Sequence, residues 1–266
     1  MNADHLCFVH ALRRVRSRAI RLRLQNDLAA VWSGIRPTVL LDACALTVAE
    51  QGAIVAACRC NATPMAVLRC PVSGNVWICR CDVLQRLLLR PDDEFYGHVR
   101  LVDVDTLEAT ALVESEWFKP VRTYLLEALA SARHGDVIEL CDWHVFPPAL
   151  TGVLLGYPVV FTRRREAWER PLELGGDVPL TLVQVRVESA ALVHAPSPGE
   201  VLVSSGKQST SRGVLVWSFS APASMSLDDA ALQAHFGALV DSSSAVVAGG
   251  VHIVQQRLAG DTAITL

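Results

Sequence analysis

The sequence predicts a single α/β domain over residues 1–266, with a mixed, mainly parallel sheet, helices on both faces of the sheet and antiparallel strands added in the C-terminal part. Three observations lead to this fold class. Hydrophobic residues make up 51% of the 266 residues, which supplies a sizeable core. Up to residue 161, short apolar runs alternate with helical patterns, as crossover units of a parallel sheet require. No segment of disordered composition divides the chain, so we expect no second domain.

The first part of the chain shows recognisable helix starts and turns. Asp4 is a suitable N-cap for a long amphipathic helix, and Thr47 and Glu50 have the spacing of a capping box. Asp82 is also expected to cap a helix. A turn is predicted over residues 71–74. The expected elements are a helix over 4–34, a strand over 38–42, a helix over 47–59, strands over 65–70 and 75–79, and a helix over 82–89.

The remaining elements follow from prolines, glycines and apolar alternation. Pro120 suits the first turn of a helix that Gly135 closes, and Gly156 ends a helix that opens on two prolines. Beyond residue 179 the alternation favours antiparallel strands. Residues 204–212 are low in complexity and are expected to form a flexible loop. The expected elements are a strand ending at 103, a helix over 121–134, a strand ending at 142, a helix over 147–156, strands over 158–161, 180–192 and 213–219, a helix over 228–240, and strands over 251–255 and 263–266.

Charge and cysteine content exclude several functional classes. A net charge of −3 provides no bulk basicity, so we expect no nucleic-acid partner. The chain start lacks the features of a secretory signal. Prolines and glycines interrupt the longest uncharged stretch, so we expect no membrane partner. The eight cysteines are expected to be thiols, as in a cytoplasmic protein.

The N-terminal stretch is rich in arginine and leaves two interpretations open. No acidic residue lies between Asp4 and Asp27. Residues 1–21 are therefore similar both to a mitochondrial presequence and to an N-terminal extension of the first helix with a solvated basic face. We favour the helix, because apolar residues continue in helical spacing through Leu24 and Leu28. The arginines are Arg13, Arg14, Arg16, Arg18, Arg21 and Arg23.

Three apolar runs end on an aspartate, and these residues are the main candidates for chemistry. Asp42, Asp103 and Asp142 each follow a predicted strand, and open α/β sheets bind ligands outside the carboxyl ends of their strands. If the strands are parallel, these carboxylates and that of Asp105 provide oxygen ligands for a divalent cation. His144 is then a candidate general base. The competing interpretation is that each aspartate caps a helix or starts a turn.

Two Cys-x-Cys pairs, Cys58-Arg59-Cys60 and Cys79-Arg80-Cys81, raise the question of a zinc site. Structural zinc sites usually separate paired cysteines by two to four residues, whereas one residue separates them here. We therefore interpret the cysteines as small core residues. The chain contains no Gly-x-Gly-x-x-Gly fingerprint and no Gly-x-Ser-x-Gly elbow. We predict no cofactor apart from the divalent cation considered above.

Five short motifs follow one another along the chain. They are Leu41-Asp42-Ala43-Cys44, Val102-Asp103-Val104, Cys141-Asp142-Trp143, Leu154-Leu155-Gly156-Tyr157-Pro158 and Trp217-Ser218-Phe219-Ser220-Ala221-Pro222. In this order they resemble an uncharacterised eukaryotic family that is described only as a domain of unknown function. The resemblance implies a single soluble intracellular domain that shares the three strand-end aspartates. It implies no reaction, because the family has none assigned.

We therefore expect a non-catalytic intracellular binding or scaffold protein with an unidentified protein partner. A nucleophile and a base at a recognisable spacing are missing. Two alternatives stay open: a metal-dependent hydrolase or transferase that uses Asp42, Asp103 and Asp142, and a mitochondrial matrix factor. The position of the carboxylates distinguishes the first alternative from a binding protein, and the packing of the N-terminal stretch bears on the second.

Overall fold

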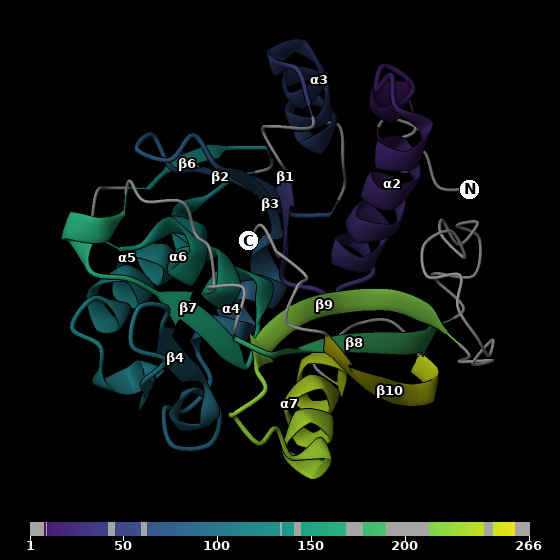
Figure 1. The fold of residues 1–266 in the computed structure, drawn as a ribbon. Helices are drawn as coiled ribbons and strands as arrows, with labels where there is room; N and C mark the ends of the chain where they lie inside the picture. The colour runs from purple at the N-terminus through teal and green to yellow at the C-terminus, as the bar shows by residue number, and fades with distance from the viewer. Residues whose placement is uncertain are drawn as a thin grey trace.

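The computed structural model describes residues 8, 10–41, 46–59, 63–133, 135–140, 145–168, 178–189, 213–241 and 247–258. These residues form an α/β fold with sheets of mixed strand direction (Figure 1), which confirms the predicted fold class. The helices are α2 (Arg18–Trp32), α3 (Val48–Arg59), α4 (Cys81–Leu88), α5 (Phe118–Ser131), α6 (Pro147–Leu155) and α7 (Asp229–Asp241), with the 3-10 helices η1 (Tyr96–His98), η2 (Leu112–Glu114) and η3 (Arg165–Ala167). The strands are β1 (Thr38–Leu41), β2 (Met65–Arg69), β3 (Val76–Arg80), β4 (Arg100–Asp103), β5 (Ala109–Ala111), β6 (Val137–Glu139), β7 (Val159–Thr162), β8 (Leu180–Ser189), β9 (Val214–Pro222) and β10 (Val247–Leu258).

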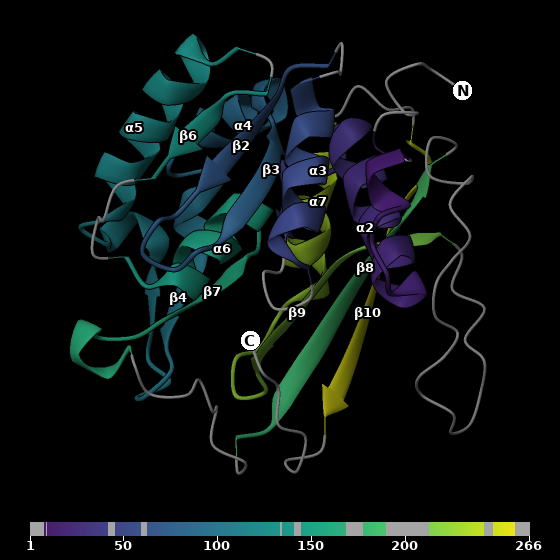
Figure 2. The ribbon, with the colours of Figure 1, turned by 90° about the horizontal axis from the view of Figure 1, so that it is seen from above.

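A four-stranded sheet in the order β1-β3-β2-β6 forms the centre of the first half of the chain. β1 and β2 each pair with β3 in antiparallel direction, and β6 pairs with β2 in parallel direction. Figure 2 shows this sheet between α2 and α3 on one side and α4 and α5 on the other. The prediction of helices on both faces is therefore confirmed for this sheet.

Alternating side chains explain why both faces of this sheet are covered. Successive residues of a strand point to opposite faces. In β3, Val76 and Ile78 lie in a smaller core together with residues of α2 and α3. Trp77 and Cys79 lie in a larger core together with residues of α4, α5 and α6. Because every side chain of 76–79 is buried, the strand is a continuous apolar run rather than an alternating one.

Two three-stranded sheets complete the described fold. The first has the strand order β5-β4-β7, in which β4 runs antiparallel to β5 and parallel to β7. In the order β10-β8-β9, the described pairs are antiparallel, which confirms the antiparallel strands expected in the C-terminal part. α7 packs against this last sheet and contributes Leu232, Phe236 and Leu239 to the larger core. Within the described ranges, no helix combines the length and the apolar character needed to span a membrane.

The sheets are less parallel than predicted. Among the described strands, two pairs are parallel and five are antiparallel. The reason is the length of the connections, since residues 70–75 join β2 to β3 and residues 104–108 join β4 to β5. Such short connections close hairpins, whereas a parallel crossover needs about a dozen residues or more. The predicted loop over 204–212 and the predicted strand over 263–266 lie outside the described residues.

The first predicted helix is interrupted before α2. This helix begins at Arg18, and the side chain of Ser17 accepts a hydrogen bond from Ile20 N at 3.4 Å as its N-cap. Directly before this cap, Arg16 N donates to Glu50 Oε1 at 3.0 Å. A serine hydroxyl competes with helical hydrogen bonds in a helix interior and favours a cap position, which explains the break.

The predicted capping box at the start of α3 is confirmed. Thr47 N donates to Glu50 Oε2 at 2.7 Å, and Glu50 N donates to Thr47 Oγ1 at 3.2 Å. Thr47 N and Thr47 Oγ1 both donate to Glu50 Oε2, and these two hydrogen bonds, together with the one from Arg16 N, lower the pKa of Glu50. The carboxylate therefore satisfies backbone donors of two segments at once.

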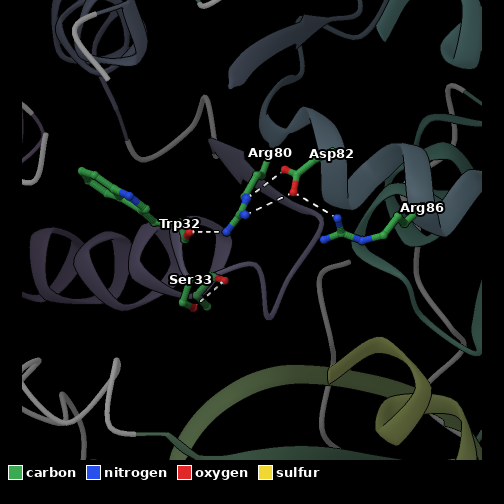
Figure 3. A network of polar contacts seen from close by, with 6 residues as sticks. Trp32, Ser33, Arg80, Asp82 and Arg86 are labelled. Atoms are coloured by element: carbon green, nitrogen blue, oxygen red, sulfur yellow. Dashed lines mark hydrogen bonds and ion pairs between the residues drawn. The ribbon is translucent and has the colours of Figure 1, made fainter. Parts of the chain in front are cut away.

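Asp82 does not cap α4 as predicted, because α4 begins at Cys81. The carboxylate of Asp82 instead accepts hydrogen bonds from Arg80 Nε at 2.8 Å and from Arg86 Nη1 at 3.1 Å (Figure 3). Arg80 Nη1 also donates to the carbonyl of Trp32 at 2.8 Å. Two charged donors satisfy the carboxylate better than a backbone amide does. The network connects the end of α2 to the start of α4.

Candidate functional site

The strand order separates the three strand ends that were predicted to share a crevice. β1 and β6 run in the same direction but form the two edges of the four-stranded sheet, with β3 and β2 between them. Because neighbouring strands of a sheet lie about 4.8 Å apart, the two edge strands are separated by about 14 Å. β4, which ends at Asp103, belongs to another sheet. Asp42, Asp142 and His144 lie outside the described residues, so the structure describes Asp103 and Asp105 of the predicted set.

Asp103 forms a local turn at the end of β4. Its Oδ1 atom accepts hydrogen bonds from Asp105 N at 2.9 Å and from Thr106 N at 3.2 Å. Its carbonyl accepts from Leu107 N at 2.7 Å, and Leu107 has a positive φ of 59°. This is the arrangement of an Asx turn, in which an aspartate side chain satisfies the amides that follow it. The turn leads β4 directly into β5.

Asp105 pairs with an arginine that the sequence did not point to. Its Oδ1 atom lies 3.1 Å from Nη2 of Arg163, and the Arg163 side chain is only 5% exposed. Arg163 directly follows β7, the parallel neighbour of β4. The ion pair therefore joins the carboxyl ends of these two strands. The signal for Arg163 in the sequence is the apolar run Val159-Val160-Phe161, which predicts a strand and ends two residues before this arginine.

Metal ligation finds no support in the described part of the chain. Among these residues, no group of three or more histidine, cysteine, aspartate or glutamate side chains is placed to hold a metal ion. Cys58, Cys70, Cys79 and Cys81 are buried free thiols, and Cys60 lies outside the described residues. A hydrogen bond from Cys79 lowers the pKa of Cys81, and the same contact and burial raise the pKa of Cys79. The described thiols thus occupy core positions, as predicted.

One motif that the structure describes in full is the turn after α6, residues 154–158, which we call the α6 turn. The last carbonyls of a helix lack partners within the helix. Here three of them accept hydrogen bonds from side chains of three other elements, β1, β9 and α7. The donors are Thr38 Oγ1 to Leu154 O at 2.8 Å, Trp217 Nε1 to Leu155 O at 3.1 Å, and His235 Nε2 to Gly156 O at 2.9 Å. The α6 turn therefore links both halves of the described fold.

Two titratable side chains at the α6 turn, the half-buried Tyr157 and the buried His235, are neutral near pH 7. Tyr157 donates its hydroxyl to Ser218 O at 3.0 Å, and burial raises its pKa. Burial lowers the pKa of His235 to about 4, and its ring stacks on Phe95 with centroids 4.5 Å apart. Since a carbonyl only accepts, His235 Nε2 carries the hydrogen toward Gly156. Both polar groups are engaged in hydrogen bonds to backbone carbonyls, which stabilise the fold.

Comparison with known proteins decides the family. The model of a family described as Domain of unknown function (DUF4504) matches residues 6–235. The chain belongs to this family. No curated protein and no solved structure matches the chain.

Membership in the DUF4504 family confirms the resemblance to a family that is described only as a domain of unknown function. The matched range includes the strand-end aspartates and the α6 turn, whereas β10 lies beyond it. The description of the DUF4504 family names no activity. The function of this DUF4504 member therefore has to be inferred from its own contacts and surface.

Proposed function

We propose that the protein is a non-catalytic binding or scaffold protein that acts on a protein partner through its surface. The observation that supports this role best is that both candidate metal ligands in the described part of the chain already bind other groups of the protein. Asp103 is held by the amides of its own turn, and Asp105 is paired with the buried Arg163. A catalytic metal centre needs carboxylate oxygens that converge on an open position. The contacts of these two aspartates are those of residues that stabilise a fold.

We place this role in the cytoplasm. Phe8, Leu12 and Val15 are at most 3% exposed and lie in the smaller core with residues of α2 and α3. The rings of Phe8 and Trp32 meet edge to face, with centroids 5.4 Å apart. Cleavage of a presequence would remove these side chains from the core. Their packing thus favours the interpretation as a helical N-terminal stretch with a basic surface rather than as a mitochondrial presequence.

Metal analysis of the purified full chain tests the proposed function. The variant Asp42→Ala/Asp103→Ala removes two candidate ligands, and Asp93→Ala/Glu94→Ala removes the same charge from exposed positions. We expect less than stoichiometric divalent metal in all three proteins. We also expect added Mg²⁺, Mn²⁺ or Zn²⁺ to leave their thermal unfolding temperatures unchanged.

One result would reject the proposal in favour of a metal-dependent hydrolase or transferase. In that case the unmodified chain binds metal stoichiometrically, and the Asp42→Ala/Asp103→Ala variant loses the metal while its circular dichroism spectrum stays native. The Asp93→Ala/Glu94→Ala control would then retain the metal, which excludes a general effect of net charge.

A further inference from the structure

Positive charge is concentrated at the start of the chain. The first 41 residues hold seven arginines and two aspartates, whereas the other 225 residues hold 17 basic and 25 acidic side chains. Six of the seven arginines fall between positions 13 and 23. A protein with a net charge of −3 therefore presents one strongly basic region.

These arginines are exposed and largely unpaired within the described residues. Arg13, Arg14, Arg16 and Arg18 are exposed, and in the described part of the chain none of them forms an ion pair with a carboxylate. Arg23 lies 3.8 Å from Asp27, but its side chain is 82% exposed and Asp27 already pairs with Arg36 at 2.8 Å. Apart from the attraction between Arg16 and the Glu50 carboxylate, these exposed charges leave a surface that attracts a ligand of the opposite charge.

The backbone that carries Arg13, Arg14 and Arg16 is held in place by hydrogen bonds and by buried neighbouring side chains. Leu12 and Val15 are buried in the smaller core, which anchors the turn between them. Val15 N donates to Leu12 O at 3.0 Å, and Arg16 N donates to Glu50 Oε1 at 3.0 Å. The second hydrogen bond holds the turn against the start of α3, and Figure 2 shows α2 and α3 side by side. The arginines thus project from a rigid support, which reduces the entropy lost on binding.

An exposed apolar residue adjoins the basic region. Val48, the first residue of α3, is 88% exposed, the largest exposed fraction among the large hydrophobic residues that the structure describes. In the sequence it lies between Thr47 and Glu50, which bind one another, and the Glu50 carboxylate also accepts from Arg16 N. Its chain neighbours Thr47 and Ala49 are also exposed, and both are small and uncharged. We call Arg13, Arg14, Arg16, Arg18 and Val48 together the basic face.

We propose that the basic face docks an acidic segment of a protein partner. In this complex, carboxylates of the partner pair with the guanidinium groups, and an apolar side chain of the partner packs on Val48. Guanidinium groups bind carboxylates through two parallel hydrogen bonds, which adds geometric specificity to the charge attraction. This inference rests on the proposed binding function and names the surface and the partner chemistry for it.

The surroundings of the basic face favour a protein over RNA or a membrane. Single-stranded nucleic acid needs exposed aromatic rings for stacking, but Phe8 is 3% exposed and its ring packs on Trp32. Membrane binding by an amphipathic helix needs a free apolar side. The apolar side chains of α2, among them Leu24, Leu28 and Val31, are buried in the smaller core. A segment that combines carboxylates with an aliphatic side chain matches both parts of the basic face.

The experiment measures fluorescence anisotropy of a labelled peptide with a leucine between two runs of four glutamates, titrated with the full chain. The variant Arg13→Glu/Arg14→Glu/Arg18→Glu reverses the basic face. The control variant Arg133→Glu/Arg164→Glu/Arg257→Glu makes the same charge change at exposed arginines elsewhere. We expect the first variant to weaken binding by about tenfold or more, and the control to stay within about twofold of the unmodified chain.

A second variant separates the apolar contact from charge attraction. We expect Val48→Ser to weaken binding of the leucine-bearing peptide, and to leave binding of an all-glutamate peptide unchanged. Circular dichroism verifies that each variant is folded. Equal losses in the basic-face variant and its control would overturn the proposal. So would tighter binding of a labelled oligouridylate, or of vesicles containing phosphatidylserine, than of either peptide.

The result stays separate from the test of the proposed function. Stoichiometric metal lost with Asp42 and Asp103 rejects the non-catalytic role, whatever the peptide titration gives. Equal losses in the two arginine variants reject the basic face as a docking surface, whatever the metal analysis gives.

Discussion

At the scale of single residues, Gly156 determines how α6 ends. It has a left-handed conformation with φ of 75°, and its N–H and carbonyl both form hydrogen bonds in the α6 turn. An added Cβ would lie 3.2 Å from Leu239 Cδ1 of α7. Glycine is therefore required here both by the backbone conformation and by the close approach of α7.

Replacing Gly156 by alanine should destabilise the protein by about 1–3 kcal/mol, because alanine strains a left-handed conformation and crowds Leu239. The measurement is the free energy of unfolding from denaturant titration. Gly52→Ala is the matched control, since Gly52 lies within α3 and nothing lies within 4 Å of its added Cβ. There alanine should stabilise by about 0.5–1 kcal/mol. Equal effects at both positions would contradict the assignment.

His235 should make stability depend on pH. Burial lowers its pKa in the folded protein to about 4, whereas the unfolded value is about 6.5. Between these values the unfolded chain binds more protons, so stability falls as the pH drops from 6.5 to 4. The loss attributable to His235 is about 3 kcal/mol over this range. In His235→Gln, which keeps a hydrogen-bond donor, denaturant titrations should show a weaker pH dependence between 6.5 and 5. An unchanged dependence would show that His235 titrates normally.

At the scale of elements, the C-terminus of α6 connects parts that are far apart in the sequence. Thr38 of β1 reaches the carbonyl of Leu154 across 116 residues, and Trp217 of β9 reaches that of Leu155 across 62. Both hydrogen bonds are buried, so losing either donor leaves a carbonyl without a partner away from water. The hydrogen bonds and packing of the α6 turn thus give its sequence a structural explanation.

Thr38→Val tests this connection, because valine keeps the shape of threonine and removes only the hydroxyl. We expect a loss of about 1–2 kcal/mol in the free energy of unfolding. The control is Thr110→Val, at an exposed position of β5. That substitution should change stability by less than about 0.5 kcal/mol. A Thr38→Val variant as stable as the control would mean that the buried hydroxyl contributes nothing.

Local signals allowed most elements to be predicted from the sequence. The reciprocal Thr47–Glu50 capping box and the glycine stop at 156 depend on residues a few positions apart, and both were predicted correctly. Ser17 was missed as a cap because the apolar spacing continues through it, and the contact that accompanies the break comes from Glu50, far along the chain. Asp82 was misassigned because its arginine partners compete with the helix amides.

At the scale of the whole molecule, the candidate site depended on strand order, which no local pattern encodes. Three apolar runs ending on aspartate were evident, but nothing near them indicates that β1 and β6 form opposite edges of one sheet while β4 lies in another. The pairing of Asp105 with Arg163 likewise arises only when β4 and β7 become neighbours. The basic face was visible as arginine content, whereas its rigid support and its proximity to Val48 required the fold.

The central claim is that the strand-end carboxylates that the structure describes stabilise turns and pairs and hold no catalytic metal. Its most direct test is the free energy of unfolding of the unmodified chain, Asp103→Asn and Asp103→Ala, each with and without millimolar Mg²⁺ or Mn²⁺. Asparagine keeps the side-chain oxygen that accepts from Asp105 N and Thr106 N. We therefore predict that Asp103→Asn matches the unmodified chain, that Asp103→Ala loses about 1 kcal/mol, and that the cations change none of the three. A cation that stabilises the unmodified chain but neither variant would contradict the claim.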